Sequence, residues 1–167
     1  MHLINNKKGV IQTVQFLFIS LILLSLIKIA WTDYKRKVIP DRWVLFLAVV
    51  SVLLLIFRGD IVWTEHILGT FCVSVPLLIC AVVFPGSFGG GDIKLMSAGG
   101  LLLGWRCALL AFIVSVYSAG IYIIIMFAGR RLDRKTQIAF GPSICVGIVA
   151  AMFWGKNIFM WYQNLTV

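Results

Sequence analysis

Five long runs of apolar residues constrain the fold of this 167-residue chain more than any other feature. They cover residues 10–31, 43–57, 66–84, 106–127 and 138–154. A helix needs roughly 17–25 consecutive, mainly apolar residues to cross a bilayer. Charged residues make up only 13% of the chain, whereas they make up about a quarter of an ordinary soluble domain. The sequence therefore predicts an all-α integral membrane protein.

A sixth apolar segment, residues 93–103, is shorter and contains two adjacent glycines. We expect it to cross the bilayer as well, which gives about six transmembrane helices. The first run is longer than the apolar core of a signal peptide, so we interpret it as a retained helix. Because no segment is left over for a soluble domain, residues 1–167 are expected to form a single transmembrane domain in the lipid bilayer.

Basic residues indicate how the helices are oriented. With six spans, the loops after spans 1, 3 and 5 share one face, which carries Lys35, Arg36, Lys37, Arg42, Lys94, Arg130, Arg131, Arg134 and Lys135. The opposite face carries Lys7, Lys8, Arg58, Arg106 and Lys156. Since cytoplasmic loops are enriched in Lys and Arg, the first face is predicted to be cytoplasmic and both termini external. The net charge of +9 then records orientation and indicates no nucleic-acid partner.

Residue types that hold metals or act as nucleophiles are scattered. The four cysteines, Cys72, Cys80, Cys107 and Cys145, lie singly in apolar segments without a Cys-x-x-Cys pair. Such cysteines are typical of small buried hydrophobic positions. His2 and His66 are predicted to lie far from the basic face, and no serine or cysteine has a base beside it in sequence. We therefore expect neither a metal site nor a cofactor.

Four of the six acidic residues have a structural explanation. Asp60 and Glu65 fall in an outer loop, and Asp133 lies among basic side chains as a solvated ion-pair partner. Asp41 follows Pro40 at the start of the next span, where its side-chain oxygen is placed to cap that helix.

Asp33 and Asp92 remain, and both lie at the predicted cytoplasmic edge of apolar spans. Ionisable groups at membrane depth are costly and are functional-site candidates for that reason. For Asp33, an ion pair with Lys35 or Arg36 is an alternative. Two carboxyls within a few ångströms share one proton. In aspartic proteases such a pair activates a water molecule and donates a proton to the substrate carbonyl.

Asp92 follows a glycine-rich loop, residues 85–92. If a helix begins near Asp92, then Met96, Gly100 and Gly104 recur every four residues along the same side. Gly100 and Gly104 form a small-x-x-x-small pair, which lets a neighbouring helix approach closely. We expect these glycines to bring another helix up to Asp92.

Two further non-helical elements are predicted on the same face, at residues 33–41 and 139–143. The pair Gly141-Pro142 is expected to open or bend the start of the last span. Together with the glycine-rich loop, these elements are expected to converge at the cytoplasmic membrane face.

The residues in these loops resemble the motifs of a known family. Gly89-Gly90-Gly91-Asp92 forms a G-x-G-D motif, which resembles that of the type IV prepilin peptidases, the membrane aspartic proteases that process pilin leaders. Asp33, followed by basic residues and Ile39-Pro40, resembles the family's other aspartate motif. Phe140-Gly141-Pro142 resembles a third, less specific motif. The resemblance covers about residues 15–155.

This resemblance implies that Asp33 and Asp92 are the catalytic pair. The positions that match the motifs around them are Gly89, Gly90, Gly91, Lys94, Ile39, Pro40, Gly141 and Pro142. The implied substrate is a type IV prepilin or a pseudopilin precursor, whose basic leader is cut from an apolar helix at the cytoplasmic face. The implied location is the bacterial inner membrane, in a multi-pass arrangement, and the oligomeric state is not specified.

Two departures from the family pattern qualify the expectation. Larger members carry an additional region with paired Cys-x-x-Cys motifs and also methylate the new amino terminus, so cleavage without N-methylation is expected here. Many members have Asn where this chain has Asp41, which adds a third carboxylate near the site, ranked below the other two.

Two other functions match part of the pattern. Presenilin-like proteases also use G-x-G-D, but they carry a Pro-Ala-Leu motif and more spans, both of which this chain lacks. A small channel or transporter with Asp92 in a pore loop is an alternative of a different class. It leaves Asp33 and the Ile-Pro loop without a role.

Overall fold

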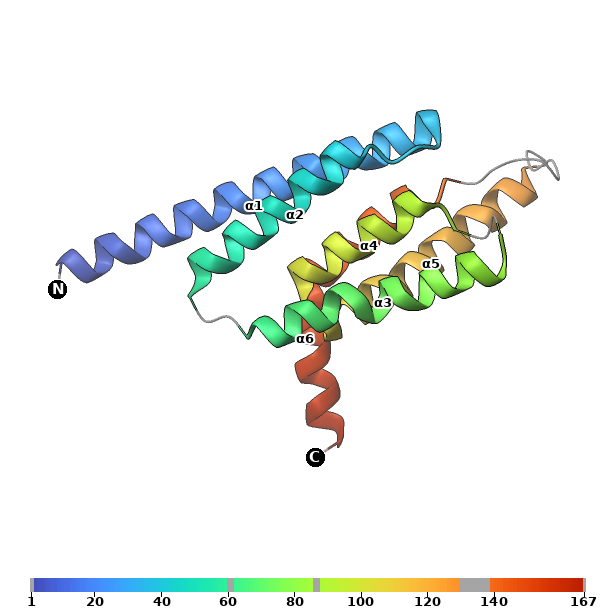
Figure 1. Cartoon of the computed structure of the whole chain (residues 1–167). Helices are drawn as coiled ribbons and strands as arrows, with labels where there is room; N and C mark the ends of the chain where they lie inside the picture. The colour runs from blue at the N-terminus through green and yellow to red at the C-terminus, as the bar shows by residue number, and fades with distance from the viewer. Residues whose placement is uncertain (1, 60–61, 86–87, 130–138, 167) are drawn as a thin grey trace.

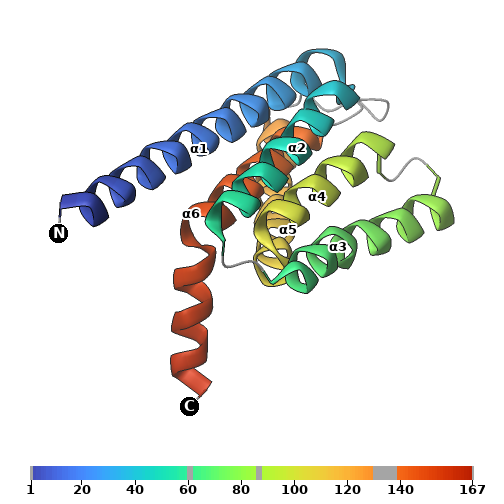
Figure 2. The same cartoon turned by 60° about the vertical axis from the view of Figure 1, so that its left-hand side comes forward.

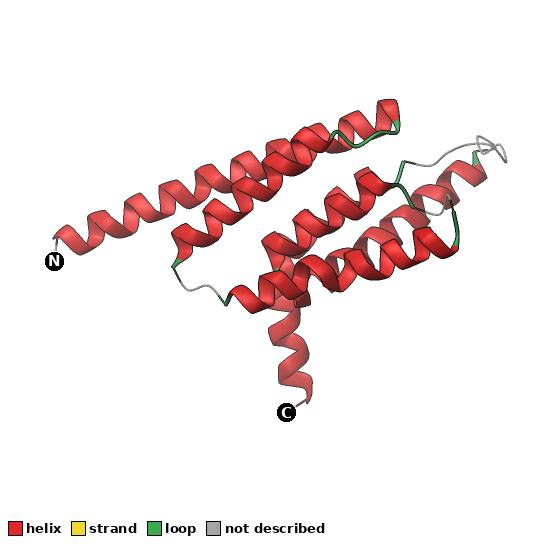
Figure 3. Ribbon diagram, in the orientation of Figure 1, coloured by secondary structure: helices red, strands yellow, loops and turns green. Residues whose placement is uncertain are grey.

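The computed structural model describes residues 2–59, 62–85, 88–129 and 139–166. These parts of the chain form six helices and contain no strand (Figures 1 and 3). The helices are α1 (His2–Arg36), α2 (Asp41–Arg58), α3 (Trp63–Val83), α4 (Gly90–Leu103), α5 (Trp105–Ala128) and α6 (Gly141–Thr166). The prediction of an all-α membrane protein is confirmed, with a helix at the place of each predicted span.

The helices differ in how well their length suits a bilayer. Three segments of the described chain are long and apolar enough to cross, namely Thr13–Arg36, Trp63–Val83 and Trp105–Ala128, and Gly141–Gly155 is a shorter apolar one. The 14 residues of α4 extend only about 21 Å at 1.5 Å per residue, whereas the hydrocarbon core is about 30 Å thick. Crossing of the membrane by α2, α4 and α6 stays a prediction.

Many of the large apolar side chains lie on the surface of the helix bundle and not in its core. Large side chains such as Phe16, Val82 and Phe127 are more than 70% exposed. Exposed apolar surface of this extent is typical of contact with a membrane. Of the cysteines, Cys145 is buried and Cys72 and Cys107 are half-buried, but Cys80 is exposed. The interpretation of all four as buried residues was therefore wrong for Cys80, which lies on the outer side of α3.

The central helix is α4, which packs against α2, α3, α5 and α6. The hairpin of α1 and α2 lies along one side of the others, and α6 passes behind α4 in Figure 1 and behind α2 in the turned view of Figure 2. Leu95 and Met96 of α4 are almost fully buried in the core that these helices enclose.

Glycines set how closely α4 approaches its neighbours. Gly100 faces Gly69 of α3, and a Cβ on either residue would overlap the backbone of the other helix. Gly99 faces Ile148 of α6 at a distance that leaves no room for a Cβ. A Cβ on Gly69 would also overlap the backbone of Gly104, so the predicted close approach of a helix at Gly100 and Gly104 is confirmed. Gly104 itself lies beyond the end of α4 at Leu103, with a left-handed φ of 78° in the turn to α5. The close approach therefore joins α4 to α3, far from Asp92.

The helices alternate in direction, so the three predicted loops meet at one end of the bundle (Figure 1). The ring of Phe88 lies 5.7 Å from that of Phe140, centroid to centroid, and joins the second loop to the third. The predicted convergence is therefore confirmed for the described residues. Asp60, Asp133 and the basic cluster at residues 130–135 lie outside them.

Candidate active site

Asp33 lies near the end of α1 and is only 5% exposed. Its Oδ2 accepts a hydrogen bond of 2.9 Å from the backbone N–H of Gly141, the first residue of α6. The first N–H groups of a helix have no partner within it, and the helix dipole favours a carboxylate there. Asp33 thus caps a helix that begins 108 residues later in the chain. Within the described part of the chain, Asp33 forms no ion pair with Lys35 or Arg36. The ion pair found there joins Lys94 to Asp41.

Gly141 has a steric reason to be glycine. A Cβ at this position would overlap the carboxyl group of Asp33. Pro142 follows in the first turn of α6, where a missing N–H costs no hydrogen bond. The expectation that these two residues open or bend the last span was wrong, since they begin its helix instead.

Asp92 is the third residue of α4, and its carboxylate folds back over the start of its own helix. Its Oδ2 accepts a hydrogen bond of 3.2 Å from the N–H of Gly89, the N-cap residue. Gly89 has φ −75° and ψ 145°, an extended conformation just before the helix. The anchor of Asp92 is therefore local, three residues away.

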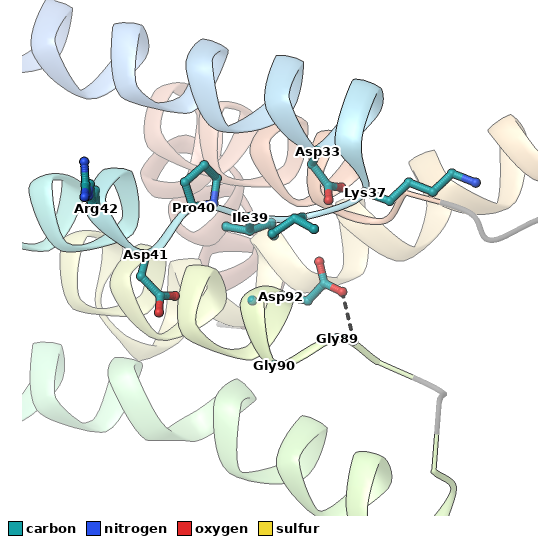
Figure 4. A pocket seen from close by; sticks show the side chains of 11 residues that line it. Asp33, Lys37, Ile39, Pro40, Asp41, Arg42, Gly89, Gly90 and Asp92 are labelled. Atoms are coloured by element: carbon teal, nitrogen blue, oxygen red, sulfur yellow. Dashed lines mark hydrogen bonds between the residues drawn. The ribbon is translucent and has the colours of Figure 1, made fainter.

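The two carboxyl groups line one pocket of about 610 Å³. Figure 4 shows them pointing toward one another, Asp33 from α1 and Asp92 from α4. In each group Oδ2 is held by a backbone N–H. The Oδ1 atoms have no hydrogen bond within the described part of the chain and are available to a water molecule or a peptide group.

The pocket changes the acidity of Asp92, which precedes the apolar segment 93–103. Burial, opposed by the hydrogen bond from Gly89 and aided by the nearby charge of Asp33, raises the pKa of the Asp92 carboxyl to about 6. A carboxyl with such a pKa holds its proton almost to neutral pH. The arrangement is suited to a pair that shares one proton.

The chain between α1 and α2 forms the roof of the pocket. Lys37, the residue after α1, has a left-handed φ of 53°, and its N–H donates to the carbonyl oxygen of Asp33 at 2.7 Å. Ile39, which is 8% exposed, packs against Gly91, where a Cβ would lie 2.8 Å from the Cβ of Ile39. Gly91 therefore lets the start of α4 come up against this roof. Pro40 lines the pocket and serves as the N-cap residue of α2.

Asp41 does not have the role predicted for it. It makes no capping hydrogen bond, because α2 begins at Asp41 itself and the N-cap position is taken by Pro40. Lys94 of α4 instead donates to both carboxylate oxygens of Asp41, at 2.9 and 2.8 Å. Both side chains are more than half exposed. The third carboxylate of the site is thus neutralised by the residue two places after Asp92, a partner that sequence spacing did not reveal.

Gly90 and His66 lie at opposite ends of α4. Gly90 lines the pocket with open space where a Cβ would lie. His66 lies toward the opposite end of α4, where its Nδ1 donates to the carbonyl oxygen of Leu101 at 2.8 Å. Among the described residues no three His, Cys, Asp or Glu side chains form a group suited to a metal ion.

Comparison with known proteins supplies a family. Residues 17–124 match the sequence profile of the type IV leader peptidase family. The prepilin leader peptidase/N-methyltransferase of Bacillus subtilis is 32% identical over 151 residues, which cover 90% of this chain and 59% of that protein. The protein of the same name from Legionella pneumophila is 29% identical over 165 residues, 90% of this chain and 54% of that one. The chain therefore spans little more than half the length of these relatives. No solved structure gives a significant match.

Proposed function

Because this chain belongs to the type IV leader peptidase family, we propose that it is a membrane aspartic endopeptidase acting through Asp33 and Asp92. Its substrates are type IV prepilins or pseudopilins, from which it removes the basic leader. The observation that carries this proposal is that α1 and α4 each contribute one carboxyl to a single pocket. The relatives' names supply the class of substrate.

In the proposed reaction the pair begins with one proton between its two carboxyl groups. The ionised carboxylate takes a proton from a water molecule as the water oxygen bonds to the carbonyl carbon of the scissile peptide. The protonated carboxyl gives its proton to the carbonyl oxygen. The carbon now carries two hydroxyl groups, and the C–N bond breaks as the nitrogen takes up a proton from the pair and one hydroxyl group returns a proton to it. This leaves a carboxyl terminus on the leader, a new amino terminus on the pilin and one proton on the pair.

The hydrogen bonds to Oδ2 support this chemistry by fixing both groups. The N–H of Gly141 holds Asp33, and the N–H of Gly89 holds Asp92. A carboxyl group held by backbone donors loses little freedom when the reaction begins, which favours a reactive geometry. The third carboxylate, Asp41, forms an ion pair with Lys94 and is not part of the reacting pair.

We place the site at the cytoplasmic face of the bacterial inner membrane. The support is the positive charge around the pocket, where Lys37 and Arg42 belong to the lining and cytoplasmic loops are enriched in such residues. Cleavage by these 167 residues without N-methylation is part of the proposal, since they contain no Cys-x-x-Cys pair.

Co-expression with a prepilin in cells that lack their own peptidase tests the proposal. The wild-type chain should shorten the precursor on a gel, and the mass of the product should show an unmethylated amino terminus. Asp33→Asn and Asp92→Asn should each abolish the shift while the protein still accumulates in the membrane. Cleavage retained in either variant removes that aspartate from the mechanism.

A further inference from the structure

The proposed function requires a substrate helix to reach α4 from the lipid, and most of the surface of α4 is closed. Gly100 packs directly on Gly69 of α3, and Gly99 packs on Ile148 of α6. Contacts this close leave no space for a further helix on either side. An approach to Asp92 must therefore use another face of α4.

The exposed residues of α4 mark that face. Lys94 is exposed, and Ile93, Ser97 and Leu101 are half-buried. At 100° per residue these four positions lie within one narrow sector of the helix. Together with the exposed Gly90, they form the open face of α4.

A groove of about 480 Å³ runs along this open face, between α4 and α2. Below a charged rim, α2 lines the groove with the apolar side chains of Val44, Leu45 and Ala48, and α4 lines it with the small side chains of Ser97 and Ala98. Small side chains let a neighbouring helix pack closely within a bilayer. At the rim lie Asp41 and Arg42, and both also line the pocket that holds the aspartates. The groove and the pocket therefore adjoin at these two residues.

The pocket shows where the chain of a substrate would continue. Asp41 and Arg42 lie at one end and Asp33 lies at the other, with Ile39 and Pro40 between them (Figure 4). Gly90 forms part of the floor, and nothing lies within 4 Å of its open side. An extended backbone can cross the start of α4 there, and a peptide bond must be in an extended stretch to be accessible to the pair.

A second apolar groove does not meet this requirement. It has a volume of about 560 Å³ and is lined by Leu68, Phe71, Cys72, Val75, Pro76 and Trp105. It shares no lining residue with the pocket of the aspartates. Trp105 follows the end of α4 opposite to Asp92, so a helix in this groove would not lead to the site.

We propose that the groove between α2 and α4 receives the apolar helix of the precursor, and that the segment before this helix passes between Gly90 and the Ile39-Pro40 roof to Asp33 and Asp92. The proposal rests on the peptidase function and adds the route by which the substrate arrives. The Lys94–Asp41 ion pair marks the point where the helix ends and the extended segment begins.

The test compares the two grooves with a purified protein and a synthetic precursor, made of a lysine-rich leader and an apolar helix of about 20 residues. Ala48→Trp fills the groove between α2 and α4, and Val75→Trp fills the other. Ala48→Trp should lower the cleavage rate about tenfold or more, because binding energy from the remote helix is lost, and Val75→Trp should leave it near that of the wild type. Equal rates for Ala48→Trp and wild type overturn the inference.

A second measurement does not depend on cleavage or on the fold of Ala48→Trp. A benzophenone amino acid placed at position 97 or at position 75, in the Asp92→Asn background, is irradiated with the intact precursor. An adduct to the apolar helix from position 97 and none from position 75 is expected, and the reverse result or equal adducts contradict the route. If the wild type leaves the precursor uncut, the peptidase proposal fails, and the adducts still report where the helix binds.

Discussion

Asp33 and Asp92 line the same pocket, but the protein holds them in different ways. Asp92 accepts a hydrogen bond from Gly89, three residues away, and so caps the start of α4, the helix that contains it. Asp33 accepts a hydrogen bond from Gly141, 108 residues away, and so caps the start of α6, a helix of which it is not part. One carboxyl group is therefore positioned by local backbone structure and the other by tertiary structure. This difference predicts that substitutions around the two anchors should have unequal effects.

The largest difference is expected between Gly141→Ala and Gly89→Ala. The methyl group at position 141 overlaps the carboxyl group of Asp33, and a displacement of about 1 Å costs on the order of a hundredfold in rate. The methyl group at position 89 lies 3.2 Å from Oδ2 of Asp92, and the backbone there is extended. We expect only a slight loss. Initial rates of precursor cleavage, with membrane accumulation as a control for folding, compare the two variants. Similar losses in both would show that the anchors are equivalent.

The second prediction concerns pH and follows from the pKa of Asp92. This carboxyl loses its proton as the pH rises through about 6. Above that pH Asp92 has no proton to donate to the carbonyl oxygen, so the rate should fall as the pH rises, by up to about tenfold for each pH unit. A lysine-only leader avoids titration of the substrate between pH 4 and pH 8. A rate that stays constant from pH 5 to pH 8 contradicts the role of Asp92.

The stability of the fold should depend on pH in the same sense. The folded-state pKa of Asp92 is raised from 3.8, so its carboxyl favours the folded state below pH 3.8, and this contribution is lost as the pH rises through about 6. Asp92→Asn should therefore raise the unfolding temperature at pH 7 and leave it unchanged near pH 3.5. Thermal unfolding in detergent at the two pH values measures the effect. A variant destabilised at pH 7 would mean that the Asp92 hydrogen bond outweighs its burial.

A smaller effect is expected where α4 meets the roof of the pocket. In Gly91→Ala the new methyl group presses on Ile39, and overpacking of this kind costs about 1–3 kcal/mol. Gly90→Ala places its methyl group in open space and should raise the free energy of unfolding slightly, by about 0.4–1 kcal/mol. Denaturant titration of the two neighbours tests this contrast. Equal stabilities would indicate that Ile39 shifts to make room for the new methyl group at little cost in free energy.

The smallest effect is expected for the third carboxylate. Asp41 and Lys94 are both more than half exposed, and exposed ion pairs contribute about 0–1 kcal/mol. Asp41→Asn and Lys94→Gln should each keep most of the cleavage activity, measured by the same gel shift. A loss comparable to that of Asp33→Asn would make Asp41 part of the reacting group.

The sequence predicted the helices and the two aspartates because both depend on local patterns. Apolar runs define spans, and each aspartate lies in a short motif. The partners of these groups were not predictable in the same way. Nothing in the spacing indicates that Asp33 caps Gly141, that Asp41 pairs with Lys94 or that Gly100 faces Gly69. Each of these contacts depends on which helices become neighbours, and a rule for capping that considers only adjacent residues assigned Asp41 the wrong role.

The bond between Asp33 and Gly141 also has a consequence for how the protein is made. A ribosome delivers α1 first, and the N–H that holds its aspartate appears only when residue 141 and the helix after it have been synthesised and inserted. Until then the carboxyl group of α1 lacks its anchor, although α4 and Asp92 are already present. The pocket is therefore completed late in biogenesis, and a partly made chain with both acidic groups in place still lacks the contact that holds the first of them.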